Sequence, residues 1–325
     1  MIRRREFMTL LGGAAAAWPL AARAQRAPMA LVGLLEGSHL DDRQLEAVRQ
    51  GLKEAGYIEG RNLAIKYRSG DGHFDRLPGL AAALVADRVA VLLTFGPPAA
   101  MAAKAATATI PVVFATGADP IELGLVSSLN RPGGNITGVS FLVTTLASKR
   151  LELLRELVPG ATVVGFLINP ANPTSESQTR DAQAAAFALG LRLPIHGASS
   201  DADINAAFAS FAQQRVAAVI VGTDQFFGAR HDLLVGLATR YAMPTIYYLR
   251  EAVASGGLMS YGTSITDAFH LAASYAGRIL KGERPADLPV QQTVKFELVL
   301  NLKTAKMLGL EIPGTLLARA NEVIE

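Results

Sequence analysis

Residues 89–116 read VAVLLTFGPPAAMAAKAATATIPVVFAT, and this stretch decides the fold. Residues 89–95 and 111–116 are short and mostly apolar, which is typical of strands buried on both faces of a sheet. The Ala-rich segment between them opens with Pro97 and Pro98, and proline is tolerated in the first turn of a helix. A strand, a helix and a second strand in this order predict two parallel strands joined by a helical crossover.

The same alternation continues on both sides of this unit. Further apolar runs of strand length lie at residues 29–35, 63–67, 136–141, 163–168, 191–195, 217–221, 245–248 and 296–300. Helical patterns lie at residues 45–55, 77–86, 119–129, 146–157, 176–189, 204–214, 231–241 and 265–280. A turn-rich cluster at residues 130–135 interrupts the alternation, which then restarts. The pattern predicts an α/β fold of two similar lobes, each a parallel sheet covered by helices.

Composition narrows the class of protein. The chain has 325 residues, which corresponds to about two domains at ~150 residues each. It carries 31 Lys and Arg residues against 28 Asp and Glu residues, and the whole surplus lies in the first 24 residues. Because the rest is neutral, a nucleic-acid partner, which needs a basic face, is disfavoured. The chain contains no cysteine, which excludes disulfides, thiolate metal sites and a cysteine nucleophile.

The first 24 residues have the features of an export signal. Arg4 and Arg5 precede an apolar stretch at residues 7–22, which is the twin-arginine form. Residues 22–24, Ala-Arg-Ala, fit the small-x-small rule for signal cleavage and leave Gln25 as the mature N-terminus. The alternative is a membrane anchor, but a span needs about 20 apolar residues and this run is shorter. We therefore expect a mature protein that works in the periplasm.

The usual motifs of cofactor-dependent and catalytic proteins are missing. The sequence has no G-x-G-x-x-G after a strand, no phosphate loop, no G-x-S-x-G elbow and no H-E-x-x-H helix. The five histidines are scattered without metal-ligand spacing, at His39, His73, His196, His231 and His270. We therefore expect no cofactor, no metal and no enzymatic activity, and a binding protein instead.

Candidate binding residues follow the predicted strands, because ligands of open α/β sheets bind beyond the carboxyl ends of the strands. The segments Glu36-Gly37-Ser38-His39, Thr94 to Ala99 and Thr116 to Asp119 supply, in the first half, Ser38, His39, Thr94, Gly96, Ala99, Thr116 and Asp119. The helix that starts at Gly96 offers free N–H groups, such as that of Ala99, to a ligand carboxylate. Ordinary capping or turn hydrogen bonding is the alternative role for Ser38, Thr94 and Asp119.

The second half offers matching groups at its own strand ends. They are Ser140, Asn169, Asn172, Asp224, Phe226, Phe227, Tyr248 and Tyr261. The four aromatic residues suggest an aromatic-walled cleft, and core packing is the alternative for each ring. A buried cationic group of a ligand would need a paired anion, so Asp119 or Asp224 is expected to face any such group.

Several long blocks carry a family resemblance that spans the predicted mature chain. The blocks are GYIEGRNL at 56–63, DPIELGLV at 119–126, LNRPGGNITGVS at 129–140, KRLELL at 149–154, GLMSYG at 257–262, NLKTAK at 301–306 and LARA at 317–320. They closely resemble ABC transporter substrate-binding proteins of the tryptophan/tyrosine-uptake type. The resemblance implies a class I periplasmic-binding-protein fold, in which two Rossmann-like lobes with parallel sheets are joined by a multi-strand hinge.

The resemblance also implies a function. The chain is expected to bind an amino acid or a small aromatic carboxylate between its lobes, as a monomer, and to deliver it to an ABC permease whose ATPase is a separate chain. A sensor subunit of the same fold and a periplasmic hydrolase are the alternatives. We expect residues 28–139 and 264–284 in the first lobe, and residues 140–263 and 285–325 in the second. The chain should then cross between the lobes near residues 137–140, 261–264 and 284–288.

Overall fold

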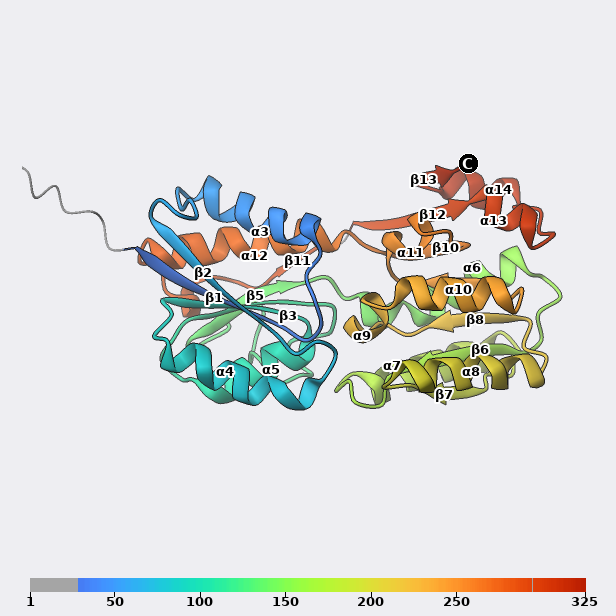
Figure 1. Ribbon diagram of the computed structural model, residues 1–325, viewed down its shortest axis with the longest axis horizontal. Coiled ribbons are helices and arrows are strands. Elements are labelled where there is room, and N and C mark those ends of the chain that lie inside the picture. The colour runs from blue at the N-terminus through green and yellow to red at the C-terminus, as the bar shows by residue number, and fades with distance from the viewer. Residues whose placement is uncertain (1–28, 294) are drawn as a thin grey trace, which may run out of the picture.

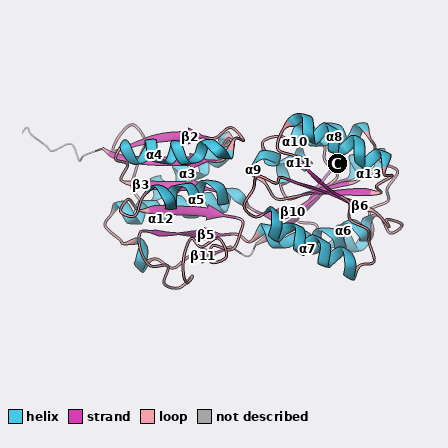
Figure 2. Ribbon diagram, turned by 90° about the horizontal axis from the view of Figure 1, so that it is seen from below, coloured by secondary structure: helices cyan, strands magenta, loops and turns pink. Residues whose placement is uncertain are grey.

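The computed structural model describes residues 29–293 and 295–325, which form two lobes lying side by side (Figure 1). Figure 1 shows helices above and below the sheet of the first lobe, and Figure 2 shows the same layering in the second lobe. The predicted α/β architecture of two lobes is therefore confirmed. The predicted export signal at residues 1–24 lies outside the described residues. Within the part of the chain that the structure describes, none of the helices has the length and apolar composition needed to cross a bilayer.

The first lobe is built on a six-stranded parallel sheet in the order β11-β5-β4-β3-β1-β2. Its strands are β1 (Ala30–Glu36), β2 (Leu63–Ser69), β3 (Val91–Phe95), β4 (Val112–Thr116), β5 (Ile136–Ser140) and β11 (Gln291–Gln292). Its helices are α3 (Asp42–Glu54), α4 (Leu77–Ala86), α5 (Pro97–Ala106) and α12 (Ile265–Leu280), with short 3-10 turns η1 (Phe74–Arg76) and η3 (Pro285–Asp287). Helices α3 and α12 pack on one face of the sheet, and α4 and α5 pack on the other.

The second lobe contains a seven-stranded sheet in the order β13-β12-β10-β9-β8-β6-β7, in which β12 runs antiparallel to β10. Its strands are β6 (Val164–Ile168), β7 (Ile195–Gly197), β8 (Ala218–Val221), β9 (Thr245–Tyr247), β10 (Met259–Thr263), β12 (Phe296–Asn301) and β13 (Glu322–Ile324). Its helices are α6 (Ala147–Leu157), α7 (Ser175–Ala188), α8 (Asp201–Gln213), α9 (Gln225–Gly228), α10 (His231–Arg240), α11 (Arg250–Ala254), α13 (Leu302–Met307) and α14 (Gly314–Arg319), with η2 (Val143–Leu146).

The chain passes between the lobes after β5, after β10 and between β11 and β12. The third crossing lies between β11 and β12, so the prediction of a crossing near residues 284–288 is wrong. Gln291 and Gln292 pair with β5 in the first sheet, and the Thr137 hydroxyl donates to the Leu288 carbonyl at 2.6 Å. Residues 285–292 therefore belong to the first lobe and not, as predicted, to the second. The short strand β11 pairs with the outer edge of β5, whose backbone N–H and C=O groups would otherwise have no strand partner on that side.

The segment at residues 119–129 is also different from its prediction. It forms a series of turns and not a helix. The Leu123 N–H donates to the Asp119 carbonyl at 3.1 Å, but Gly124 then adopts a left-handed φ of 64°. Such a glycine ends a helical turn as soon as it has formed. The Asp119 carboxylate caps this turn by accepting from the Ile121 N–H at 2.7 Å.

Candidate functional site

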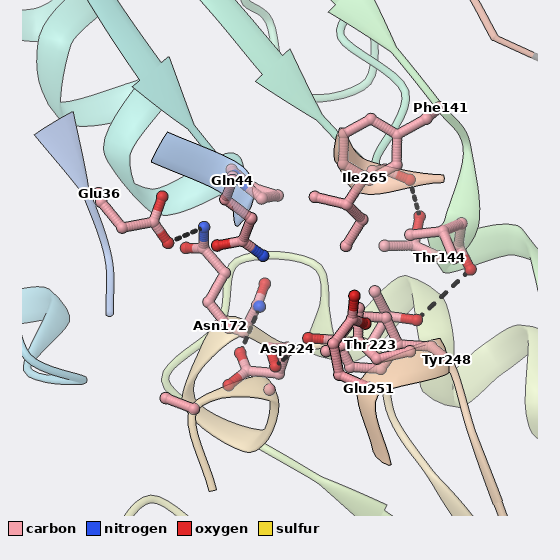
Figure 3. Close-up of a pocket in the computed structure, with 18 of the residues that line it drawn as sticks. Glu36, Gln44, Phe141, Thr144, Asn172, Thr223, Asp224, Tyr248, Glu251 and Ile265 are labelled. Atoms are coloured by element: carbon pink, nitrogen blue, oxygen red, sulfur yellow. Dashed lines mark hydrogen bonds between the residues drawn. The ribbon is translucent and has the colours of Figure 1, made fainter. Parts of the chain in front are cut away.

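A cavity of about 260 Å³ lies between the lobes, at the carboxyl ends of the strands of both sheets. The first lobe lines it with Glu36, His39, Asp41, Gln44, Gly96, Ile265 and Phe269, among others. The second lobe contributes Phe141, Val143, Thr144, Asn172, Thr223, Asp224, Gln225, Tyr248 and Glu251 (Figure 3). Its volume is close to the lower end of the range for small-molecule sites, ~300–1,000 Å³.

Asp224 lies at the second-lobe wall of the cavity within a closed set of hydrogen bonds. It is the N-cap of α9, where its Oδ1 accepts from the Phe226 N–H at 2.8 Å. The same oxygen accepts from Asn169 Nδ2 at 3.0 Å, and Oδ2 accepts from Asn172 Nδ2 at 2.5 Å. Burial raises the pKa of Asp224 to about 6, although these donors oppose the rise. Both carboxylate oxygens therefore already have partners within the lobe.

Arg150 of α6 holds the neighbouring segments together from behind the cavity. Its Nε donates to the Tyr261 carbonyl at 2.9 Å, Nη1 to Thr223 Oγ1 at 3.0 Å and Nη2 to the Val143 carbonyl at 3.1 Å. The side chain is 1% exposed, and desolvation lowers its pKa to about 9. At neutral pH the guanidinium group is therefore charged, and neutral oxygens accept its hydrogen bonds.

The first-lobe wall is less complete. Glu36 ends β1, is 3% exposed, and accepts through Oε1 from Nε2 of Gln225, which comes from the opposite lobe. Its Oε2 is buried and has no hydrogen-bond partner among the described residues. The same holds for Oε1 of Gln225 and for Oγ1 of Thr94, which lies behind the cavity. Burial raises the pKa of the Glu36 carboxyl well above its ordinary value. This wall thus contains polar atoms that the folded chain leaves unpaired.

Gln225 brings the two lobes into contact at the start of α5. Its Nε2 also donates to the Phe95 carbonyl at 2.8 Å. A Cβ at Gly96 would lie 2.4 Å from Cδ of Gln225, and Gly96 has a φ of 82°. Only glycine fits such a backbone position and such a close approach. The helix start that was predicted to receive a ligand carboxylate therefore lies directly against the Gln225 amide.

The structure brings part of the predicted site together. The predicted residues that line the cavity are His39, Gly96, Asn172, Asp224 and Tyr248. Those buried behind it, in strand ends, loops and the first turn of α5, are Ser38, Thr94, Ala99, Thr116, Ser140 and Asn169. Thr116 Oγ1 accepts from the Ala118 N–H at 3.2 Å, and Ser140 Oγ donates to the Ala118 carbonyl at 3.1 Å. Asp119, in its turn after β4, is not among the residues that line the cavity.

The predicted aromatic wall is corrected by the positions of three rings. Phe226 and Phe227 are 2% and 1% exposed and belong to the second-lobe core with α8 and α10. Tyr261 stacks on Phe296 with ring centroids 5.9 Å apart, in another part of that lobe. Tyr248 lines the cavity and donates its hydroxyl to the Asp224 carbonyl oxygen at 2.8 Å. Apolar rings at a lobe surface gain more by packing into the core than by facing a polar cleft.

Other cavity residues were not among the predicted site residues. Glu36 begins the predicted strand-end segment 36–39, and Thr223 and Gln225 flank the predicted Asp224, so their position at strand ends was the available signal. Gln44 and Glu251 come from helices α3 and α11, and no local motif marks them.

Comparison with known proteins identifies the family of this two-lobed protein. The sequence profile of the family "ABC transporter substrate binding protein" matches residues 29–324. The chain belongs to this family. A tyrosine-binding protein of Clostridioides difficile is 27% identical over 270 residues, which cover 83% of this chain and 77% of that protein.

Two solved structures extend the comparison. A conserved domain protein from Vibrio cholerae has a TM-score of 0.83 and 29% identity, and covers 91% of this chain and 99% of its own. An ABC domain from Streptococcus pneumoniae in complex with L-Trp has a TM-score of 0.81 and 28% identity, and covers 90% of this chain and 100% of its own. The family is one of substrate-binding proteins, and two of these relatives are described by an amino acid, tyrosine for one and L-Trp for the other.

Proposed function

We propose that this protein is the periplasmic solute receptor of an ABC importer. It binds an amino acid or a small aromatic carboxylate between its lobes and delivers it to a membrane permease that works with a separate ATPase. The observation that carries the proposal is the cavity at the strand ends, which both lobes line in a chain of the substrate-binding family. The signal-like residues 1–24 support export to the periplasm.

The ligand class follows from the lining and from the relatives. Tyr248, Phe141, Ile265 and Phe269 provide apolar surface for a ring or an aliphatic chain. One relative is named for tyrosine and a structural relative holds L-Trp, which supports an aromatic amino acid as the first candidate.

Binding is expected to be coupled to a hinge motion. A ligand that contacts both lobes stabilises the closed arrangement by the difference between its affinities for the closed and open forms. The three interlobe crossings form the hinge, and the Gln225 contacts with Glu36 and Phe95 add to the closed form.

The test is a thermal-shift screen of the mature chain against amino acids and aromatic acids, followed by calorimetry on the best hit. We expect one solute per chain, recovered chemically unchanged by mass spectrometry, and a smaller radius of gyration in small-angle scattering. Trp18 is the single tryptophan of the sequence and lies in the predicted signal. The mature chain would therefore give no tryptophan fluorescence signal on binding, and calorimetry replaces it. A hit that is converted to product would support a hydrolase and contradict the receptor. Uptake of the hit by cells should be lost when the gene is deleted.

A further inference from the structure

The cavity has an uneven distribution of charged groups. Among the described residues that line it, the carboxyl side chains are Glu36, Asp41, Asp224 and Glu251, and none of the lining residues is Lys or Arg. The guanidinium group of Arg150 lies nearby but donates its hydrogen bonds to oxygens of its own lobe. Among the described lining residues the basic side chains are thus limited to the imidazoles of His39 and His231, whereas four carboxyl groups are present as acceptors for a cation.

The four carboxyl groups are not equivalent. Asp224 accepts on both oxygens from within its lobe, and Asp41 is exposed and caps α3 through the Gln44 N–H. Glu251 is only partly buried. Glu36 alone combines almost complete burial with an oxygen, Oε2, that has no partner among the described residues. Figure 3 shows the Glu36 carboxyl group at the end of β1. A dashed line marks the hydrogen bond on one of its oxygens, and the other oxygen has none.

We propose that Glu36 accepts the cationic amino group of the ligand, so that the receptor selects solutes that carry an amine. A buried carboxylate is costly without a counter-charge or a donor, and an ammonium group supplies both. Glu36 also lies at the carboxyl end of β1, an interior strand of the parallel sheet, and ligands of such sheets bind at that end. The inference rests on the proposed function, and it assigns to Glu36 the role that the sequence analysis gave to Asp119 or Asp224.

The contact with Gln225 connects this pairing to the opposite lobe. Gln225 donates to Oε1 of Glu36, which leaves Oε2 for a second donor. An ammonium group on Oε2 would keep the carboxyl ionised, and an ionised carboxyl accepts a stronger hydrogen bond from the Gln225 amide. The amine of the ligand would therefore form its own contact with Glu36 and also strengthen the contact between Glu36 and Gln225 of the opposite lobe.

Matched pairs of probes test the inference on the unaltered mature protein. L-tyrosine is compared with 3-(4-hydroxyphenyl)propionate, and L-tryptophan with indole-3-propionate, because each pair differs only by the amino group. Tyramine keeps the amine and lacks the carboxylate. We expect the amino acids to raise the melting temperature and to bind in calorimetry about 30-fold or more tightly than their deaminated partners.

Variants then locate the acceptor. Glu36→Gln keeps the shape of the side chain and should weaken amino-acid binding by about 30-fold or more, with little effect on any deaminated partner that binds. Its melting temperature should not fall, because the variant removes a buried charge, whereas a purely structural role would lower it. Asp119→Asn is the matched control, since Asp119 caps a turn outside the cavity, and it should bind as the parent does. Asp224→Asn tests the competing carboxylate.

The outcomes separate this inference from the proposed function. Equal binding of an amino acid and its deaminated partner would overturn the role of Glu36 and leave the receptor function standing. Selective loss of amine binding in Asp224→Asn but not in Glu36→Gln would move the role to Asp224 and overturn the inference as well. Failure of every amine and acid probe to bind at millimolar concentrations would count against both.

Discussion

The two walls of the cleft differ in how completely their polar groups are paired. On the second-lobe wall, Asp224 is held by Asn169 and Asn172, and Arg150 is held by Thr223 and two carbonyl oxygens. On the first-lobe wall, Oε2 of Glu36 is buried without a partner among the described residues, and so is Oγ1 of Thr94 behind that wall. From the second lobe, Oε1 of Gln225 is also buried without a partner, at the contact with Glu36. A fully paired network holds its side chains in one arrangement, whereas unpaired buried groups favour a ligand or a proton that completes them. The Asp224 and Arg150 networks thus make up a preformed part of the second-lobe wall, and the unsatisfied polar atoms of the lining lie where Glu36 of the first lobe meets Gln225.

The strand-end loops of the two lobes also differ, in how closely a side chain of the other lobe can approach their backbone. At the strand ends of the first lobe, Gly96 and Gly117 allow second-lobe side chains to approach the backbone. A Cβ at Gly117 would lie 2.5 Å from Cγ1 of Val143, and a Cβ at Gly96 would overlap Gln225. The second lobe provides side chains where the first provides bare backbone, and this lets the lobes close on each other.

The largest effect is expected when the second-lobe network loses its cation. Arg150→Ala removes a fully buried side chain and leaves the Val143 and Tyr261 carbonyls without these donors. We expect the free energy of unfolding to fall by about 3–5 kcal/mol, measured by urea denaturation. Arg150→Lys retains the charge and the stem and should recover part of the loss. A stability equal to that of the parent in Arg150→Ala would contradict the idea of a preformed part of the second-lobe wall.

A smaller loss is expected at the cap of α9. Asp224→Ala removes the N-cap acceptor and leaves the amides of Asn169 and Asn172 without it. The free energy of unfolding should fall by about 2–4 kcal/mol near pH 7, again measured by denaturation.

The pH dependence of stability gives a second measure of the same change. Burial raises the Asp224 pKa to about 6 in the folded protein, above the ordinary value of 3.8. The folded state therefore binds this proton more tightly than the unfolded state, so this group's contribution to stability falls as pH rises from about 4 to 6. The Glu36 carboxyl shifts in the same direction. Asp224→Ala should reduce this slope, and an unchanged slope would show that Asp224 does not titrate in this range.

The smallest effects come from a pair of matched substitutions, one on each wall. Thr223→Val removes the acceptor of Arg150 Nη1 and should cost about 1–2 kcal/mol. Thr94→Val removes a buried hydroxyl that has no partner among the described residues and should be neutral within about 0.5 kcal/mol, or stabilising. Thermal and urea unfolding of the two variants and the parent would measure both changes. Equal losses at the two positions would remove the distinction between the walls.

The sequence by itself determined the features that depend on neighbouring residues. The run at residues 89–95, the Pro97-Pro98 opening and the run at residues 111–116 became β3, α5 and β4, because burial on both faces requires continuous apolar residues and proline suits a first helical turn. The segments that follow β1, β6 and β8 were also recognisable, since strand ends in a parallel sheet lie along one edge. Helix capping by Asp41 follows from the same local chemistry.

Only the tertiary structure decided which of those side chains face the cleft and which of them form hydrogen bonds with residues far away in the sequence. Asp224 and Phe226 are two residues apart, yet the first lines the cavity and the second is buried in the core. Glu36 meets Gln225 across 189 positions of sequence, and the two-residue strand β11 forms by pairing with β5, which lies about 150 positions earlier in the chain. The physical reason is that hydrogen bonding and burial depend on what lies opposite in space, whereas a local pattern specifies only what lies beside a residue along the chain.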